Sequence, residues 1–223
     1  MERLYAELVR SHREDDLSFR LCTTFNLDEY VGLSSGDPRS YHAYMEEHLF
    51  RHVDIDRSRT YLLNGVAADL AAEARRYEAQ ISACGGLDLQ LLGLGEVGHI
   101  GFNEPLSALL SQTREKALTP RTREQNAQMF LDDPSGTPAR ALTMGVGTIL
   151  EAKEILLLVT GENKAEILAK ATEGPITAMI SATALQLHSN CKIIVDEAAA
   201  SRLENKDYYR WIFENEPEWG PYR

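Results

Sequence analysis

Residues Ile155-Leu156-Leu157-Leu158-Val159 form an apolar run without a polar interruption. A strand with one solvent-facing side alternates apolar and polar residues, whereas a strand buried on both faces is apolar throughout. We therefore predict that Ile155–Val159 is a strand near the centre of a helix-covered sheet. The next residues, Thr160-Gly161-Glu162-Asn163-Lys164, form a polar turn that leads into a helix.

Short apolar runs alternate with longer helical patterns on both sides of this stretch. Further strands are predicted at Leu21–Leu27, Tyr61–Leu63, Leu87–Gly93 and Lys192–Asp196. Helices are predicted at Glu2–Arg13, Arg39–Arg51, Ala67–Ala83, Arg121–Phe130, Lys164–Thr172, Thr177–Leu187 and Lys206–Asn215, and a loop at Asp132–Pro138. This alternation predicts an α/β fold: a single-domain Rossmann-like three-layer sandwich with a mostly parallel sheet, spanning residues 1–223.

The overall charge narrows the class of partner. The chain has 23 Lys and Arg against 34 Asp and Glu, a net charge of −11. This excess argues against a nucleic-acid partner, while a few local cations can still hold an anionic small molecule. No apolar run reaches the roughly 18 residues of a membrane helix, so we expect no membrane partner. Three widely spaced cysteines, Cys22, Cys84 and Cys191, indicate reduced thiols and a cytoplasmic protein.

Polar residues at strand ends are the candidates for chemistry, because ligands of α/β sheets bind at the carboxyl ends of the strands. Asp28 and Glu29 are adjacent carboxylates directly after the predicted strand Leu21–Leu27. A carboxylate there can act as a general base, and it can equally cap the following turn. The residues alone leave both interpretations open.

The most informative stretch is Leu91–Pro105. Its glycines at GxGxxG spacing are Gly93, Gly95 and Gly98. A dinucleotide site requires this loop to open a helix, but Gly101 and Pro105 interrupt any helix soon afterwards, which disfavours a nucleotide. Gly95 and Gly98 instead let the backbone approach a ligand closely, so we predict them as substrate-binding residues. His99, with Glu104 five residues later, is the candidate acid or base of this loop.

Two further junctions are less specific. Leu142–Thr148 offers small residues and hydroxyls that suit either a cleft or a tight turn. Lys164 follows the central strand at a helix start, where an ammonium suits a phosphate, although a solvated lysine fits the same pattern. His48 and His52 stand one helical turn apart without a third ligand, so no metal site is predicted.

Taken in order, these junctions resemble the glucosamine-6-phosphate deaminase family. The matching segments are Phe25–Leu33, Gly98–Pro105, Leu142–Thr148 and Gly161–Lys164. The resemblance implies conversion of glucosamine 6-phosphate and water into fructose 6-phosphate and ammonia. That reaction is a hydrolysis of a C–N bond coupled to an aldose–ketose isomerisation. The resemblance also implies an amino-sugar phosphate as ligand, no metal or organic cofactor, and a possible homo-oligomer.

The resemblance also suggests individual roles. Asp28 resembles the base that moves the C2 proton of the open-chain sugar to C1. His99 resembles the residue that assists ring opening, with Glu104 as its carboxylate, and Lys164 is similar to the phosphate-binding lysine. Glu29 lies inside the matched motif as a substrate-binding or supporting residue.

The chain departs from the family pattern at three places. The family's first strand ends in a phosphate-binding loop, whereas the first glycine here is Gly32, so we expect an N-terminally shortened domain without that strand and loop. Val97 stands where the family has Asp or Asn, and Gln128 where it has an arginine. These changes keep open the alternative of a catalytically weak sugar-phosphate sensor. A phosphogluconolactonase-like hydrolase on the same fold is a further alternative, although a lactonase has no need for a base at Asp28.

Some family members are hexamers activated by N-acetylglucosamine 6-phosphate. Arg114 and Lys116 fall where the activator's phosphate would be held. Two solvated cations on a surface loop are an equally good interpretation of the same residues.

Overall fold

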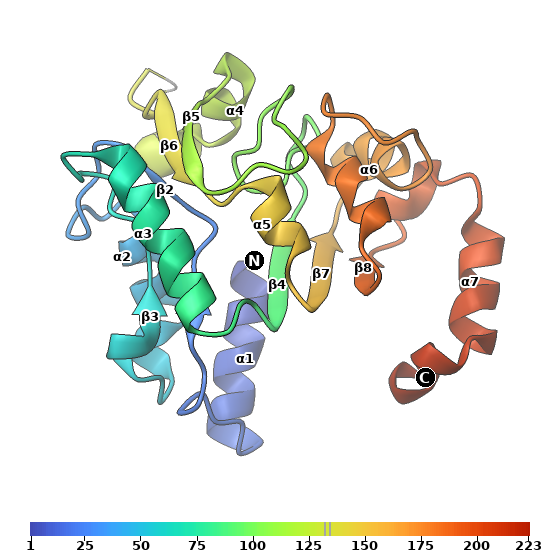
Figure 1. Ribbon diagram of the computed structural model, residues 1–223. Helices are drawn as coiled ribbons and strands as arrows, with labels where there is room; N and C mark the ends of the chain where they lie inside the picture. Colours follow the sequence, from blue (N-terminus) through green and yellow to red (C-terminus); the bar gives the residue numbers. More distant parts are fainter. Residues whose placement is uncertain (132, 134) are drawn as a thin grey trace.

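The computed structural model describes residues 1–131, 133 and 135–223 (Figure 1). Its largest parallel sheet consists of β4 (Leu89–Gly93), β7 (Glu154–Val159) and β8 (Cys191–Val195), in the order β4-β7-β8. The apolar run Ile155–Val159 therefore lies in the strand that has a neighbour on both sides. The prediction of a central strand at this position is confirmed.

The remaining strands form two smaller sheets. β1 (Thr24–Phe25) and β3 (Thr60–Tyr61) pair in parallel, separately from β4. β2 (Asp28–Tyr30), β6 (Arg140–Thr143) and β5 (Arg114–Ala117) form an antiparallel sheet in the order β2-β6-β5. The predicted α/β class with mostly parallel pairing is thus correct, but the described strands are divided among three sheets.

The antiparallel sheet was not predicted, and its strands explain why. β5 reads Arg-Glu-Lys-Ala and has no buried residue, so it carries no apolar signal. β2 is only three residues long and contains the carboxylates Asp28 and Glu29. Short polar strands are recognised by their partners in the fold, since strand propensity depends on packing and context.

Seven α-helices accompany the sheets in the described part of the chain. They are α1 (Glu2–Glu14), α2 (Tyr41–His48), α3 (Leu70–Ala83), α4 (Pro120–Gln125), α5 (Val146–Leu150), α6 (Ala165–Thr172) and α7 (Lys206–Asn215). None of the helices described is long and apolar enough to cross a membrane. The predicted loop Asp132–Pro138 includes Asp132 and Pro134, which lie outside the described residues.

The predicted helix Thr177–Leu187 is wrong. Only Ser181–Leu187 is helical, and it is a 3-10 helix. The hydroxyl oxygen of Thr183 accepts a hydrogen bond from the Thr177 N–H at 2.8 Å, and the hydroxyl donates to backbone oxygens of the same segment. A threonine side chain that bonds its own backbone competes with regular helix formation.

The main core joins the parallel strands to α3 and α6. Leu92, Leu157 and Leu168 from β4, β7 and α6 are fully buried within it. The hydroxyl of Tyr77 on α3 donates to the carbonyls of Asn26 at 2.7 Å and Tyr61 at 3.1 Å, at the ends of β1 and β3. Helix α3 therefore holds the strand that precedes Asp28 in place.

Candidate active site

Asp28 is brought against the loop that carries His99 and Glu104. It pairs with Thr143 across β2 and β6, and Gly101 lies against both. A Cβ atom on Gly101 would stand 3.6 Å from Asp28 Oδ2 and 3.0 Å from Thr143 Oγ1. Asp28, the first residue of β2, and the glycine-rich loop are about 70 residues apart in the sequence and lie against each other in the structure.

The environment of Asp28 favours its neutral form. Burial raises the pKa of the carboxyl to about 8, and the adjacent Glu29 adds a smaller electrostatic contribution. The charge of Asp28 also contributes to raising the pKa of the buried phenols of Tyr30, Tyr41 and Tyr77. A carboxylate with a pKa near neutrality is suited to accept and return a proton.

Glu29 faces the other way and serves helix α2. Its Oε1 accepts from the N–H groups of Tyr30 at 2.9 Å and Tyr41 at 3.1 Å, and its Oε2 accepts from the His42 N–H at 3.2 Å. Only 1% of the residue is exposed. Burial raises its pKa to about 7, although these three hydrogen bonds oppose the rise. The contacts describe a carboxylate that anchors the start of α2; the predicted contact with substrate stays a prediction.

His99 and Glu104 form a buried acid–base pair. His99 Nδ1 lies 3.6 Å from Glu104 Oε2, and neither atom has a hydrogen-bond partner. Glu104 Oε1 accepts from the backbone N–H of Thr119 at 2.9 Å. Burial opposes ionisation of Glu104, but the favourable interactions with His99, Thr119 and Thr122 outweigh it and lower its pKa. Glu104 is therefore a stable anion beside the imidazole.

The two glycines of this loop make room for the side chains around them. A Cβ on Gly95 would overlap the His99 ring, and one on Gly98 would come within 2.9 Å of Ile167 Cδ1 and 2.5 Å of Ile180 Cγ2. Gly98 also has a φ of +81°, which favours glycine. The described contacts of both glycines are with the protein itself, so their predicted contact with substrate stays a prediction.

Asn103 was missed from the sequence as a residue of this site, and Arg114 was considered only as a possible contact for an activator's phosphate. Asn103 is fully buried, and its amide donates to the carbonyls of Ile100 and Met144, both at 2.9 Å. Its Oδ1 accepts from Arg114 Nη1 at 2.9 Å. Asn103 lies inside the matched segment Gly98–Pro105, which was the available signal. Arg114 is a half-buried residue of β5 that is bonded to the loop of His99 and Glu104, and not a solvated cation on a surface loop.

Lys164 is the cation at the end of the central strand. It closes the short helix Glu162–Lys164 after β7 and is half-buried. Burial lowers its pKa. Val97 is partly exposed in the loop before His99, and Gln128 is exposed beyond α4. Val97 and Gln128 carry no charge, so neither can accept a proton or form an ion pair with an anion.

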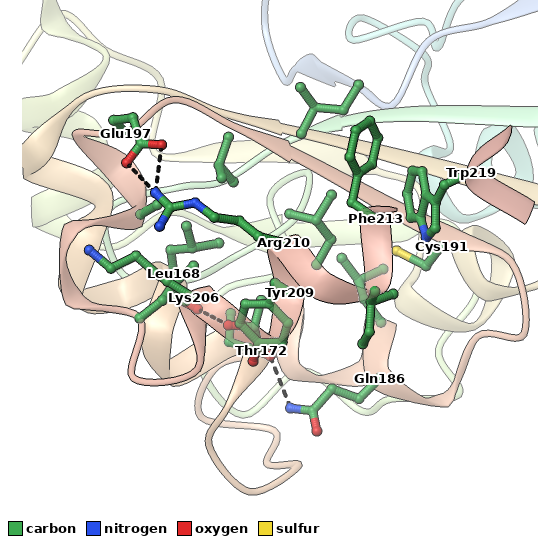
Figure 2. A pocket seen from close by; sticks show the side chains of 18 of the residues that line it. Leu168, Thr172, Gln186, Cys191, Glu197, Lys206, Tyr209, Arg210, Phe213 and Trp219 are labelled. Carbon is green, nitrogen blue, oxygen red and sulfur yellow. Dashed lines mark hydrogen bonds and ion pairs between the residues drawn. The ribbon is translucent and has the colours of Figure 1, made fainter. Parts of the chain in front are cut away.

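A separate cavity lies beside the C-terminal helix α7 (Figure 2). It has a volume of about 720 Å³ and lies between β8, α6 and the C-terminal helix α7. Its walls are mostly apolar and include Ile193, Leu203 and Phe213. None of the predicted site residues lines it. Within the described residues, no group of three or more His, Cys, Asp or Glu side chains is arranged to hold a metal.

The fold and this site define an α/β protein with an acid–base centre at the strand ends. The family model described as glucosamine-6-phosphate isomerases/6-phosphogluconolactonase matches residues 1–191. The chain belongs to this family.

Its relatives agree with that assignment. The chain is 49% identical over 209 residues to a glucosamine-6-phosphate deaminase of Shewanella woodyi, covering 94% of this chain and 79% of the relative. It is 46% identical over 215 residues to one of Rhodococcus jostii, covering 96% and 83%. A solved monomeric glucosamine-6-phosphate deaminase superposes with a TM-score of 0.88 at 48% identity, over 90% of this chain and 83% of that one.

The fold extends to more distant proteins. The 6-phosphogluconolactonase of Trypanosoma brucei superposes with a TM-score of 0.65 at 20% identity, over 89% of this chain and 82% of that one. At that identity the likeness concerns the fold alone. The lactonase alternative therefore receives no support at the level of the site.

Proposed function

We propose that this chain is a glucosamine-6-phosphate deaminase, with Asp28 as the base. The observation that carries the proposal is the position of Asp28, a carboxyl with a pKa of about 8 against the loop of the His99–Glu104 pair. The names of relatives at 46–49% identity support the substrate. The ligand we propose is therefore an amino-sugar phosphate.

The residues account for the steps of the reaction. His99 moves a proton between the ring oxygen and O1 as the sugar opens, while the anionic Glu104 stabilises its protonated form. Asp28 then removes the C2 proton and returns it to C1, while one proton passes from the amino group to O1, which leaves an imine at C2 and a hydroxyl at C1. Water adds to that imine and ammonia departs, so the products are fructose 6-phosphate and ammonia.

In net terms, water replaces the amine, which is hydrolysis of a C–N bond combined with isomerisation. The names of the relatives state deamination and isomerisation, and the hydrolytic class rests on this balance. In this scheme His99 carries the ring-opening proton and Asp28 carries the proton from C2 to C1.

Ammonia release from glucosamine 6-phosphate tests the proposal. We expect turnover by the unmodified chain and a loss of about 10²–10⁴-fold in Asp28→Asn, as for removal of a general base. Asp88→Asn is the matched control, because Asp88 is an exposed carboxylate that pairs with Lys153 away from the site. Equal turnover in the Asp28 and Asp88 variants would remove Asp28 as the base. Sugar-phosphate binding without ammonia release would favour a sensor.

A further inference from the structure

Glu96, Arg121 and Lys164 are three charged residues near the ends of β4 and β7. Glu96 lies in the loop after β4, and Lys164 follows β7, its neighbour in the sheet. Arg121 lies in the first turn of α4, with its Nη2 3.6 Å from Glu96 Oε2. The Glu96 N–H also donates to Gln125 Oε1 at 3.3 Å. Helix α4 is therefore connected to the glycine-rich loop at two points.

The positive charge of the Lys164 ammonium has no direct partner among the described residues. Within the described part of the chain it has neither a hydrogen bond nor an ion pair, although the residue is half-buried. Burial is the main cause of its lowered pKa; Arg121 lowers the pKa further, and Glu96 opposes both. The three charges are thus within electrostatic range of one another. A partly buried cation without an anion is costly, and a bound anion would remove that cost.

The same cations adjoin the loop of the proposed acid–base pair. Ile167, one turn after Lys164, packs against Gly98, which directly precedes His99. Glu96 lies three residues before His99 on the other side of that loop. A group bound between Arg121 and Lys164 would therefore adjoin the loop that presents the imidazole.

We propose that Arg121 and Lys164 together form the site for the phosphate of the substrate, and that the phosphate displaces Glu96 from Arg121. The choice of a sugar phosphate rests on the proposed function. A phosphate monoester carries about −1.5 to −2 charges at pH 7, which matches two cations once Glu96 has withdrawn. A guanidinium also offers paired donors to phosphate oxygens, which the exposed amide of Gln128 cannot replace.

Arg121→Gln tests the guanidinium. We expect KM for glucosamine 6-phosphate and the inhibition constant of inorganic phosphate to rise about tenfold to a hundredfold, the loss of one or more charge-assisted hydrogen bonds. The turnover number should fall by a smaller factor than KM rises, because the proposed contact of Arg121 is with the phosphate and not with the reacting carbons. Arg57→Gln is the matched control, since Arg57 forms a similar exposed ion pair with Glu46 at 3.1 Å. Unchanged constants in Arg121→Gln would overturn the proposal.

Glu96→Gln separates a phosphate site from a merely structural ion pair. Removing the competing carboxylate should lower the inhibition constant of phosphate several-fold, opposite in sign to Arg121→Gln. If the Arg121–Glu96 pair only stabilised the fold, both variants would weaken binding together, and that result would refute the proposal. Glucosamine, which lacks the phosphate, should bind equally to both variants.

Binding and turnover distinguish this inference from the proposed function. Calorimetry measures the binding of fructose 6-phosphate to the unmodified chain and to Arg121→Gln, and it does so without requiring ammonia release. Binding that depends on Arg121 without ammonia release would contradict the deaminase and support the site. Ammonia release with a KM that does not change in Arg121→Gln would support the deaminase and contradict the phosphate site. No binding of fructose 6-phosphate or inorganic phosphate to the unmodified chain would contradict the site.

Discussion

The two carboxylates of the candidate active site, Asp28 and Glu104, have pKa values shifted in opposite directions, although Glu104 is buried and Asp28 is partly buried. Burial raises the pKa of Asp28 to about 8, whereas the pKa of Glu104 is lowered. Glu104 has an imidazole 3.6 Å away and a backbone N–H at 2.9 Å, while the neighbour that most affects Asp28 is another carboxylate. Partners, and not burial alone, therefore decide which group holds a proton.

Glu29 shows that neutral hydrogen-bond donors alone do not lower the pKa of this buried carboxylate. Three backbone N–H groups bind it, yet its pKa still rises to about 7 because burial is the larger effect. Of the three carboxylates Asp28, Glu29 and Glu104, Glu104 is the one with a lowered pKa, and it has the ionisable His99 beside it. Carboxylates with pKa values pushed in opposite directions are the arrangement expected for a base and a fixed anion in one site.

Of the variants considered below, Glu104→Gln should cause the largest loss of activity, because it removes the charge that distinguishes Glu104 from Asp28. The amide keeps an acceptor for Thr119 but carries no charge to stabilise protonated His99. We expect kcat/KM to fall about 10²–10⁴-fold, the usual contribution of a general acid–base group. Steady-state ammonia release measures it, with the exposed Glu166→Gln as control. An equal loss on an open-chain analogue of the substrate would contradict a role in ring opening.

Gly95→Ala should displace the imidazole without changing any titratable group. Its new Cβ would overlap the His99 ring, so the His99–Glu104 distance must change. We expect a loss of about a hundredfold in turnover and about 1–3 kcal/mol of stability, as for overpacking of a core. Kinetics and thermal unfolding measure the two effects. Gly36→Ala, at a glycine with open space around it, is the control and should change neither.

The pH dependence of kcat/KM tests the raised pKa of Asp28. A base with a pKa of about 8 is mostly protonated at pH 7, so kcat/KM should rise about tenfold between pH 7 and pH 9. A rise centred near pH 4 instead would contradict the raised pKa. The rate should be measured with substrate well below KM, where it reports the free protein.

The raised pKa of Asp28 should also appear in the pH dependence of stability, when the unmodified protein is compared with Asp28→Asn. The folded protein binds the Asp28 proton more tightly than the unfolded chain, whose carboxyl titrates near its ordinary value. Unmodified protein therefore loses stability relative to Asp28→Asn as pH rises from about 4 to about 8, and the difference is constant above that. Denaturant unfolding at pH 5 and pH 8.5 measures it. A difference that does not change with pH would contradict the assignment.

Glu29→Gln should have the smallest effect on chemistry. The amide oxygen can keep part of the bonding to the start of α2, so we expect about 1–2 kcal/mol of lost stability and a fall in activity of only a few-fold. Urea unfolding and ammonia release measure the two. A loss as large as that in Glu104→Gln would instead indicate direct contact with substrate.

Much of the fold could be predicted because its signals are local. The apolar run at Ile155–Val159 predicted a central strand, and β7 is the middle strand of its sheet. Burial on both faces was predicted too, but only one face of β7 is fully buried, while Leu156 and Leu158 on the other face are partly exposed. Helix α7 was predicted with its observed bounds, Lys206–Asn215. The strand Arg114–Ala117 could not be predicted, because its charged residues become a strand only through pairing with β6.

The sequence by itself determined the kinds of group in the site: Asp28 and Glu29 at a strand end, and His99 and Glu104 around a glycine-rich loop. Tertiary structure decided which carboxylate is protonated, which one anchors α2, and that Arg121 meets Glu96 beside Lys164. The physical reason is distance. Electrostatic and desolvation energies depend on atoms a few ångströms apart in space, and those atoms belong to residues far apart in the chain.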